Sequence, residues 1–99
     1  MKLKLDEERY DRLQIDLIEE IKNSISRQLH SAGLKSDALR EATDNVAFMV
    51  AAILDSSQIM ESDGKPMRPY LTFEDPDTEE TLIHAGSNSW MHEYALSGD

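Results

Sequence analysis

The sequence predicts an α+β fold, in which a two-helix antiparallel hairpin is followed by a two-stranded β-hairpin and a short C-terminal helix. Apolar residues recur every three or four positions along two long segments joined by a few residues, and the final third changes to short runs of strand formers. The 99 residues have the length of a single domain, 1–99. The expected elements are helices over 6–31 and 36–58, a β-hairpin over 69–84, a short helix over 89–95 and a frayed tail over 96–99.

The first helix is expected to begin at Asp6, whose side chain is a good N-cap, and Glu7 and Glu8 then lie favourably against the helix dipole. Gly33 can take the left-handed position after the last turn, and Leu34 can fold back on that turn, as in a Schellman motif. The apolar residues fall on one stripe, namely Tyr10, Leu13, Leu17, Ile18, Ile21, Ile25 and Leu29.

The second helix is expected to begin with Ser36 as its N-cap, and its second half, from Val46 to Leu54, is apolar on almost every side. A helix of this kind must be covered on every side, and one partner helix cannot do that. We therefore expect the remaining cover to come from the C-terminal third or from a second copy in a two-fold homodimer. Asp-Gly and Pro within 61–66 end the helix.

The C-terminal third contains two short runs of strand formers, 70–73 and 81–84, separated by the acidic loop 74–80. This pattern is typical of a β-hairpin with a longer loop. Leu71 and Phe73 would share one face of the first strand, so we expect both to pack on the second helix.

The last short helix is expected to be capped by Ser89, and Trp90 and Tyr94 are four residues apart, so both could anchor it to the core. Their alternative role is contact with another protein, because aromatic residues are enriched at interfaces. The methionines are interpreted as adaptable core residues, although the pair flanking the 61–66 turn could belong to an exposed apolar patch; they are Met49, Met60, Met67 and Met91.

The chain contains no cysteine, which excludes disulfides, thiolate nucleophiles and cysteine-based zinc sites. A cysteine-free small domain favours a reducing compartment, and we expect the cytoplasm. The N-terminal residues lack the apolar stretch of a signal peptide. The longest apolar run, Val46 to Leu54, is far shorter than the roughly 20 residues that a membrane-spanning helix needs.

The net charge of −10 is concentrated in residues 36–99, which hold 13 acidic and three basic residues, whereas residues 1–35 hold seven of each. An acidic surface repels phosphate backbones and anionic lipid, so we expect neither nucleic acid nor membrane as a partner. It would attract a protein with a basic surface and raise the rate of encounter. The alternative is that the charge serves solubility alone.

Two groups of residues are candidates for metal chemistry, although no cofactor is expected. His84, His92 and Glu93 could converge across the loop 86–89, and two histidines with a carboxylate form a recognised ligand set, although the His-Glu-x-x-His zinc motif is absent. The carboxylates of 75–80 alternate in a way that suits calcium, but the glycine and the distant glutamate of an EF-hand are missing.

The sequence thus favours a non-enzymatic protein-interaction or regulatory module, homodimeric and directed at a basic partner. The alternative is a small metal-dependent or acid–base enzyme that uses His84, His92 and Glu93. The candidate partner-binding residues are the steering acids Glu74, Asp75, Asp77, Glu79 and Glu80 and the aromatic anchors Tyr70 and Trp90.

Overall fold

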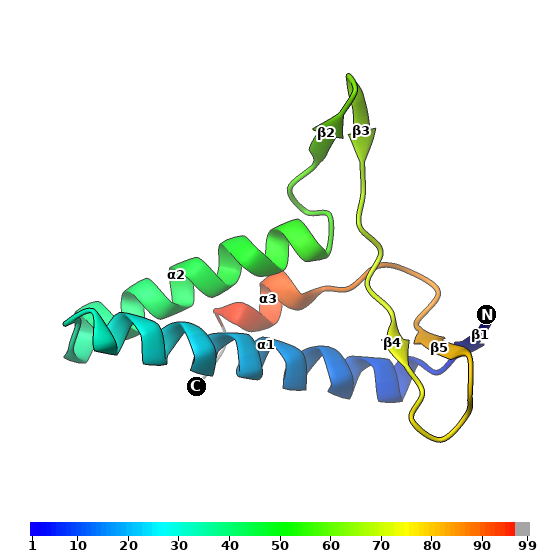
Figure 1. Cartoon of the computed structure of the whole chain (residues 1–99), viewed down its shortest axis with the longest axis horizontal. Helices are drawn as coiled ribbons and strands as arrows, with labels where there is room; N and C mark the ends of the chain where they lie inside the picture. Colours follow the sequence, from blue (N-terminus) through cyan, green and yellow to red (C-terminus); the bar gives the residue numbers. More distant parts are fainter. Residues whose placement is uncertain (97–99) are drawn as a thin grey trace.

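A computed structural model of the chain describes residues 1–96 (Figure 1). The α+β class is confirmed, with a helical pair, a β-hairpin and a short C-terminal helix in the expected order. Of the tail expected to fray over 96–99, residues 97–99 lie outside the described residues. The elements are β1 (Lys2–Leu5), α1 (Glu7–Ser31), α2 (Ser36–Leu54), β2 (Met60–Ser62), β3 (Lys65–Met67), β4 (Phe73–Glu74), β5 (Thr81–His84) and α3 (Met91–Ala95).

Both ends of α1 follow the sequence prediction. The side chain of Asp6 caps the helix by accepting a hydrogen bond of 3.1 Å from the backbone N–H of Arg9. At the other end, the Leu34 N–H donates to the Leu29 carbonyl at 3.1 Å and the Gly33 N–H donates to the His30 carbonyl at 3.0 Å. These are the two bonds of a Schellman motif, and they require the positive φ of 105° that Gly33 adopts. The motif turns the chain back into α2.

The start and the end of α2 differ from the prediction. Ser36 is not the N-cap, because its φ of 55° is left-handed, and the cap position belongs to Lys35, whose side chain makes no capping bond. The helix ends at Leu54 rather than at residue 58, because Ser56 adopts a left-handed φ of 67° and directs the chain away. Residues without a glycine's freedom occupy αL at a cost, so both turns depend on their surroundings.

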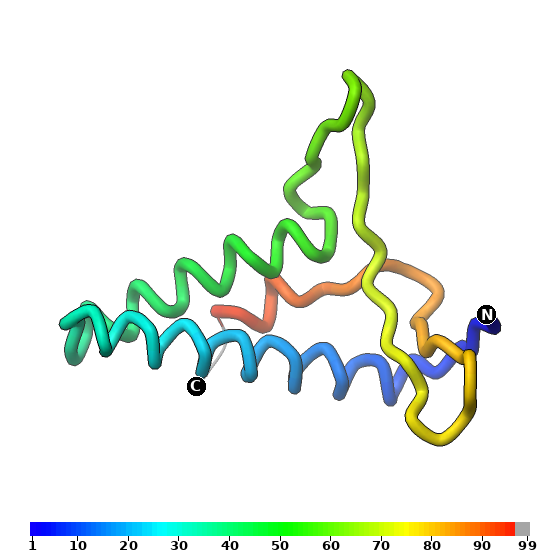
Figure 2. Tube along the Cα trace, viewed as in Figure 1, coloured from blue at the N-terminus to red at the C-terminus, as the bar shows by residue number. Residues whose placement is uncertain are grey.

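The third helix lies in the angle between α1 and α2 and packs against both (Figures 1 and 2). The buried core consists of residues from these three helices, and most of them are small, which lets the helices approach closely; they are Ile18, Ala47, Ala51, Met91 and Ala95. The C-terminal third therefore covers one side of α2, as expected. Among residues 1–96, no helix has both the length and the apolar character needed to cross a membrane.

The predicted hairpin is confirmed by the antiparallel pair β4–β5, and β1, which was not predicted, adds to β5 in parallel to make a three-stranded sheet. Strand β4 is short because the Leu71 backbone bonds elsewhere, its N–H to the Asn88 side chain at 3.3 Å and its carbonyl to the Tyr10 hydroxyl at 2.6 Å. Of the two residues expected to pack on the second helix, Leu71 packs against the helical core, whereas the ring of Phe73 lies edge-on to Tyr10 of α1 at 5.4 Å. The sheet thus packs on α1.

A second hairpin, β2–β3, projects from the end of α2 in the segment where the sequence predicted only a turn (Figure 2). Asp63 and Gly64 have φ values of 53° and 74°, the pattern of a two-residue type I′ turn. Met60 and Met67 lie opposite each other at its base. Both are about half exposed, and so is Met49 of α2, so the core role expected of these three methionines is wrong, while Met91 is fully buried. We call residues 59–68 the arm.

Candidate functional site

A groove of about 370 Å³ lies between the first turns of α1 and the loop that precedes α3. Its wall on the α1 side carries three carboxylates, Glu7, Glu8 and Asp11. Asp11 follows Glu8 by three residues and Glu7 by four, so the three side chains lie on one face of the helix. The loop side contributes Trp90, whose side chain is among the most exposed aromatic groups of the described chain at 56% exposure. No lysine, arginine or histidine is among the residues that line the groove.

The loop is fixed to α1 through the buried side chain of Gln14. The Gln14 Oε1 atom accepts hydrogen bonds from the Ser89 hydroxyl at 2.7 Å and from the Trp90 backbone N–H at 2.9 Å. The Ser89 Oγ atom in turn accepts from the Met91 N–H at 3.1 Å, so it serves the first turn of α3 although the helix formally begins after Trp90. The backbone of Trp90 is thereby held, and its indole remains at the rim of the groove.

Asn88 ties the same loop to the residues that follow α2 and to the segment between β3 and β4. Its Nδ2 atom donates to the Pro69 carbonyl at 2.8 Å and to the Ser56 hydroxyl at 3.2 Å. Its Oδ1 atom accepts from the N–H groups of Leu71 and Ser89. Asn88 thus bonds through both its nitrogen and its oxygen, and these bonds join the groove wall to its neighbouring segments.

Asp11 joins the α1 wall of the groove to α3. Its Oδ1 atom accepts hydrogen bonds from the Tyr94 hydroxyl at 2.6 Å and from Gln14 Nε2 at 2.8 Å. The hydrogen bond to the Asp11 carboxylate, together with burial, raises the pKa of Tyr94 to about 12, so Tyr94 stays neutral and donates at physiological pH. The groove therefore combines negative charge, one aromatic face and a hydrogen-bonded frame.

The cluster of Asp55, His92 and Ser57 resembles a hydrolase triad in composition but not in geometry. His92 Nδ1 lies 2.5 Å from Asp55 Oδ2 and 2.9 Å from Ser57 Oγ, so both partners meet the same ring nitrogen. In a catalytic triad the serine and the aspartate bind opposite nitrogens of the ring, which is how the imidazole takes the serine proton. Here the histidine instead fastens α3 to the end of α2.

The Asp55 carboxylate is buried at this contact between α3 and the end of α2. Burial alone would raise the pKa of Asp55, but hydrogen bonds from the side chain and backbone of His92 and from Ser57 outweigh it, so the pKa lies below its ordinary value. The backbone N–H groups of His92 and Ser57 both donate to this carboxylate at 3.0 Å. The charge is therefore stabilised in place, as a structural anion.

The candidate metal ligands His84, His92 and Glu93 are not brought together as a metal set. His84 lies on β5, where its Nδ1 atom accepts a hydrogen bond of 3.2 Å from the Gly86 N–H, and His92 is engaged by Asp55. Among residues 1–96, no group of three or more histidine, cysteine, aspartate or glutamate side chains could hold a metal ion. The site geometry thus offers no support for metal chemistry.

The acidic loop divides into one buried acid and several exposed ones. The carboxylate of Asp75 is almost fully buried and lies 3.6 Å from Lys4 Nζ and 3.5 Å from Arg9 NH1. A hydrogen bond from the Asp77 N–H and the nearby charges of Arg9 and Lys4 hold the pKa of Asp75 below its ordinary value, although desolvation opposes them. Asp75 thus joins the loop to the N-terminal segment. The loop acids that remain at the surface are Glu74, Asp77, Glu79 and Glu80.

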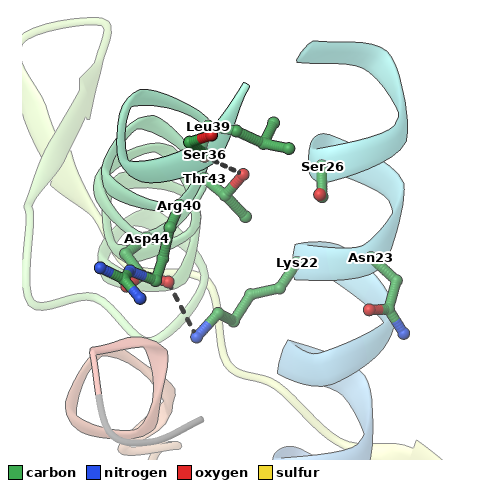
Figure 3. Close-up of a pocket in the computed structure, with 8 residues that line it drawn as sticks. All are labelled: Lys22, Asn23, Ser26, Ser36, Leu39, Arg40, Thr43 and Asp44. Carbon is green, nitrogen blue, oxygen red and sulfur yellow. Dashed lines mark hydrogen bonds and ion pairs between the residues drawn. The ribbon is translucent and has the colours of Figure 1, made fainter. Parts of the chain in front are cut away.

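A larger groove of about 680 Å³ lies between the second half of α1 and the first half of α2 (Figure 3). Its charged groups already have partners. Lys22 Nζ pairs with Asp44 at 3.0 Å and donates to the Ala95 carbonyl at the same distance, and Arg40 pairs with Asp37 at 3.0 Å. A charged ligand would have to displace these contacts. In the smaller groove Asp11 is likewise engaged, but no ion pair is found for Glu7 or Glu8 in the described part of the chain, so the groove beside Trp90 is the better candidate.

Sequence reasoning identified Trp90 but missed the acids that face it. Glu7 and Glu8 were assigned to the helix dipole alone, and nothing local in the sequence places the loop before α3 against the first turns of α1. Tyr70, the other aromatic candidate, is 52% exposed on the segment between the arm and β4, and it does not line the groove. Comparison of the chain with protein-family models, curated proteins and solved structures gave no match.

Proposed function

We propose that the chain is a non-enzymatic protein-interaction module that binds a basic segment of a partner protein in the groove beside Trp90. The observation that carries the proposal is the combination of three carboxylates and one exposed indole around a groove lined by no basic residue. The absence of a cysteine suits a reducing compartment, and we propose the cytoplasm as the place of action.

The chemistry of the groove selects a cationic side chain. A guanidinium or ammonium group placed over the face of a tryptophan is attracted by the ring quadrupole, typically by about 0.5–1 kcal/mol at an exposed site. Each carboxylate a few ångströms away adds roughly 1 kcal/mol in water at low salt. Arginine can satisfy both kinds of contact at once, because its planar guanidinium stacks on aromatic faces and binds carboxylates through two N–H groups.

Trp90 provides a direct readout, because it is the single tryptophan of the chain. We expect a short arginine–glycine repeat peptide to change the intrinsic fluorescence of Trp90 in a saturable manner at low salt, and to lose affinity as salt is added. The control peptide carries citrulline in place of arginine, which keeps the shape and removes the charge. An equal response to both peptides, or no response to either, contradicts the proposal.

The double variant Glu7→Gln and Glu8→Gln tests the groove itself. Removal of two charges close to the bound cation, at roughly 1 kcal/mol each, should weaken the arginine peptide by about 30-fold at low salt. The matched control is Glu19→Gln with Glu20→Gln, which removes the same charge from exposed positions of the same helix. If the two double variants bind equally, net charge and not the groove is responsible.

The exposed loop acids are proposed as steering charges for the same encounter. Reversal of Glu79 and Glu80 to lysine should lower the association rate of the arginine peptide at low salt and leave its dissociation rate unchanged, since distant charges act on the encounter. Stopped-flow fluorescence of Trp90 measures both rates. An association rate that is unaltered at low salt removes the loop from the interface.

A homodimer is the second part of the proposal, and a separate observation supports it. Val46, Met49 and Ile53 lie within about 60° of one another around α2 at 100° per residue, and they are 38%, 59% and 42% exposed. This apolar stripe lies on the side of α2 away from the buried Ala47 and Ala51. Sedimentation equilibrium at micromolar concentration tests the dimer, and a mass of one chain contradicts it.

A further inference from the structure

The arm is the most exposed part of the described chain. Every residue from 57 to 68 is exposed, and β2 and β3 pair over only three positions. A two-stranded hairpin standing alone is at best marginally stable in water, because it has little apolar surface to bury. The arm nevertheless has a defined turn and register. A second surface packed on the arm would bury apolar area and thereby stabilise the hairpin.

The arm carries an apolar face of its own. Met60 and Met67 are directly opposite in the register, so their side chains leave the hairpin on the same face, and they are 47% and 49% exposed. Methionine is unbranched and polarisable, and it adapts to an apolar surface presented to it. The stripe of Val46, Met49 and Ile53 on α2 is a surface of that kind.

The total exposed area indicates how much cover is missing. The chain exposes 6869 Å² for a mass of 11.2 kDa, whereas a compact monomer of that mass exposes about 5,700 Å². The excess, about 1,200 Å², exceeds the roughly 800 Å² that each partner contributes to a standard interface. Twelve large apolar side chains are exposed among the described residues, while four are fully buried. The chain is therefore less compact than a monomer of its mass, by an area comparable to one side of a standard interface.

The charges of the two surfaces indicate that the cover is a second copy. A chain of net charge −10 repels its own copies over most of its surface. Residues 45–54 of α2, however, contain no charged side chain, and the arm holds two acids and two bases: Glu61, Asp63, Lys65 and Arg68. The stripe and the arm are thus neutral surfaces through which two copies can meet without repulsion.

The positions of the two surfaces permit a reciprocal contact. The arm rises from the end of α2 at a steep angle to that helix (Figure 1), and the stripe residues belong to the half of α2 that is nearer the arm in sequence. In a two-fold dimer any contact from one chain to the other is made twice. One arm on the stripe of the other chain therefore implies the converse, and both apolar surfaces are covered together.

We propose that the β2–β3 arm is a clasp that packs its Met60–Met67 face on the Val46–Met49–Ile53 stripe of a second copy of this chain. The inference rests on the homodimer proposed above and names the surface that forms it. It assigns the arm a role in assembly, and none of the five residues of the arm face and the stripe lines the groove beside Trp90.

Cysteine cross-linking tests the clasp cleanly, because the chain has no cysteine of its own. The single variants Met67→Cys and Met49→Cys, one of them carrying a mass tag, are mixed, allowed to exchange and oxidised. We expect the mixed disulfide between arm and stripe to form faster than the disulfide between Met67→Cys and the control variant Leu3→Cys, which is exposed on β1. Mass spectrometry identifies the linked species.

The double variant Met60→Gln and Met67→Gln gives a second, independent measurement. It removes apolar surface from exposed positions without adding charge, and we expect the dimer dissociation constant to rise at least about tenfold while the circular dichroism spectrum is unchanged. The control is Met1→Gln with Leu3→Gln, which changes two exposed apolar residues far from the arm in sequence; they are 80% and 64% exposed.

The outcomes separate the clasp from the proposals on which it rests. The clasp is overturned, and the homodimer retained, by two results together. Met67→Cys forms a disulfide with Met49→Cys no faster than with Leu3→Cys, and the double variant Met60→Gln and Met67→Gln dimerises normally. A protein that sediments as one chain overturns both the clasp and the homodimer. Binding of the arginine peptide to Trp90 is measured separately, so neither result decides the proposed function of the groove.

Discussion

The three-helix region buries its large apolar side chains, whereas the arm leaves similar side chains exposed. Ile18 of α1 is 2% exposed against α2 and α3, whereas Met67 of the arm is 49% exposed on a hairpin that stands out from the body. Both are large apolar residues, so the difference lies in their neighbours and not in their chemistry. The comparison teaches that substitutions in the helices should affect folding, and that substitutions in the arm should affect association.

The largest expected effect is on the free energy of unfolding, after a substitution in the core of the three-helix region. Ile18→Ala deletes buried atoms at the centre of the core, and we expect it to lower the free energy of unfolding by about 2–5 kcal/mol. Met67→Ala should change the same quantity by less than about 0.5 kcal/mol, measured at concentrations low enough to keep the protein monomeric. Urea denaturation followed by Trp90 fluorescence measures both, and equal losses would contradict the comparison.

A smaller effect is expected where the groove is fixed to α1. Gln14→Ala leaves the Ser89 hydroxyl and the Trp90 N–H without their acceptor, and an unsatisfied buried group costs about 1–3 kcal/mol. The variant should also weaken the arginine peptide, since the loop that carries Trp90 loses its anchor. Gln28→Ala, an exposed position on the same helix, is the control and should leave both quantities unchanged.

The turn between α1 and α2 should give an effect of about 1 kcal/mol. Gly33 has a φ of 105°, where a side chain is strained, while the space around its Cα is open, so Gly33→Ala tests backbone strain without a steric clash. Thermal unfolding should show a lowered midpoint. Gly64→Ala, at the positive φ of the arm turn, should leave that midpoint unchanged at concentrations low enough to keep the protein monomeric, and should weaken the dimer instead.

Acid should have the smallest effect near neutrality and a growing effect below it. The pKa values of Asp55 and Asp75 are lowered in the folded chain, so their stabilising contribution is complete above the unfolded pKa of about 3.9 and is lost as the pH falls through the folded values. The urea midpoint should therefore be flat from pH 7 to about pH 5 and fall below that. In Asp55→Asn the fall should be shallower, and an unchanged slope would show that Asp55 does not contribute.

Much of the fold was predictable because its signals are local. The Asp6 cap, the three- and four-residue apolar spacing of α1, and the glycine that ends it all act within one or two turns of a helix. The arm was missed although Asp-Gly is a strong hairpin signal, because strands of three residues with a proline in one of them carry little strand pattern. The strand β1 was missed because it pairs with β5 across almost the whole chain.

The candidate site was predictable only in part. Trp90 could be singled out as the one tryptophan, and the acidic charge could be counted, but which acids face the indole depends on long-range contacts. The steering role proposed for Asp75 loses its basis once Lys4 and Arg9 are seen to bury that carboxylate. Glu7 and Glu8 lie in the first turn of α1, as the helix-dipole argument predicts, and they also line the groove, which the sequence alone does not indicate.

The sequence by itself determined the α+β class, the helical pair and its Schellman turn, and a net charge of −10. These features follow from propensity, periodicity and composition, which need no knowledge of remote partners. The tertiary structure decided which acids are free, which methionines are exposed and where Trp90 lies. Such properties depend on contacts between residues far apart in the chain, such as Arg9 with Asp75 across 66 positions and Gln14 with Ser89 across 75, and only the folded chain brings these residues together.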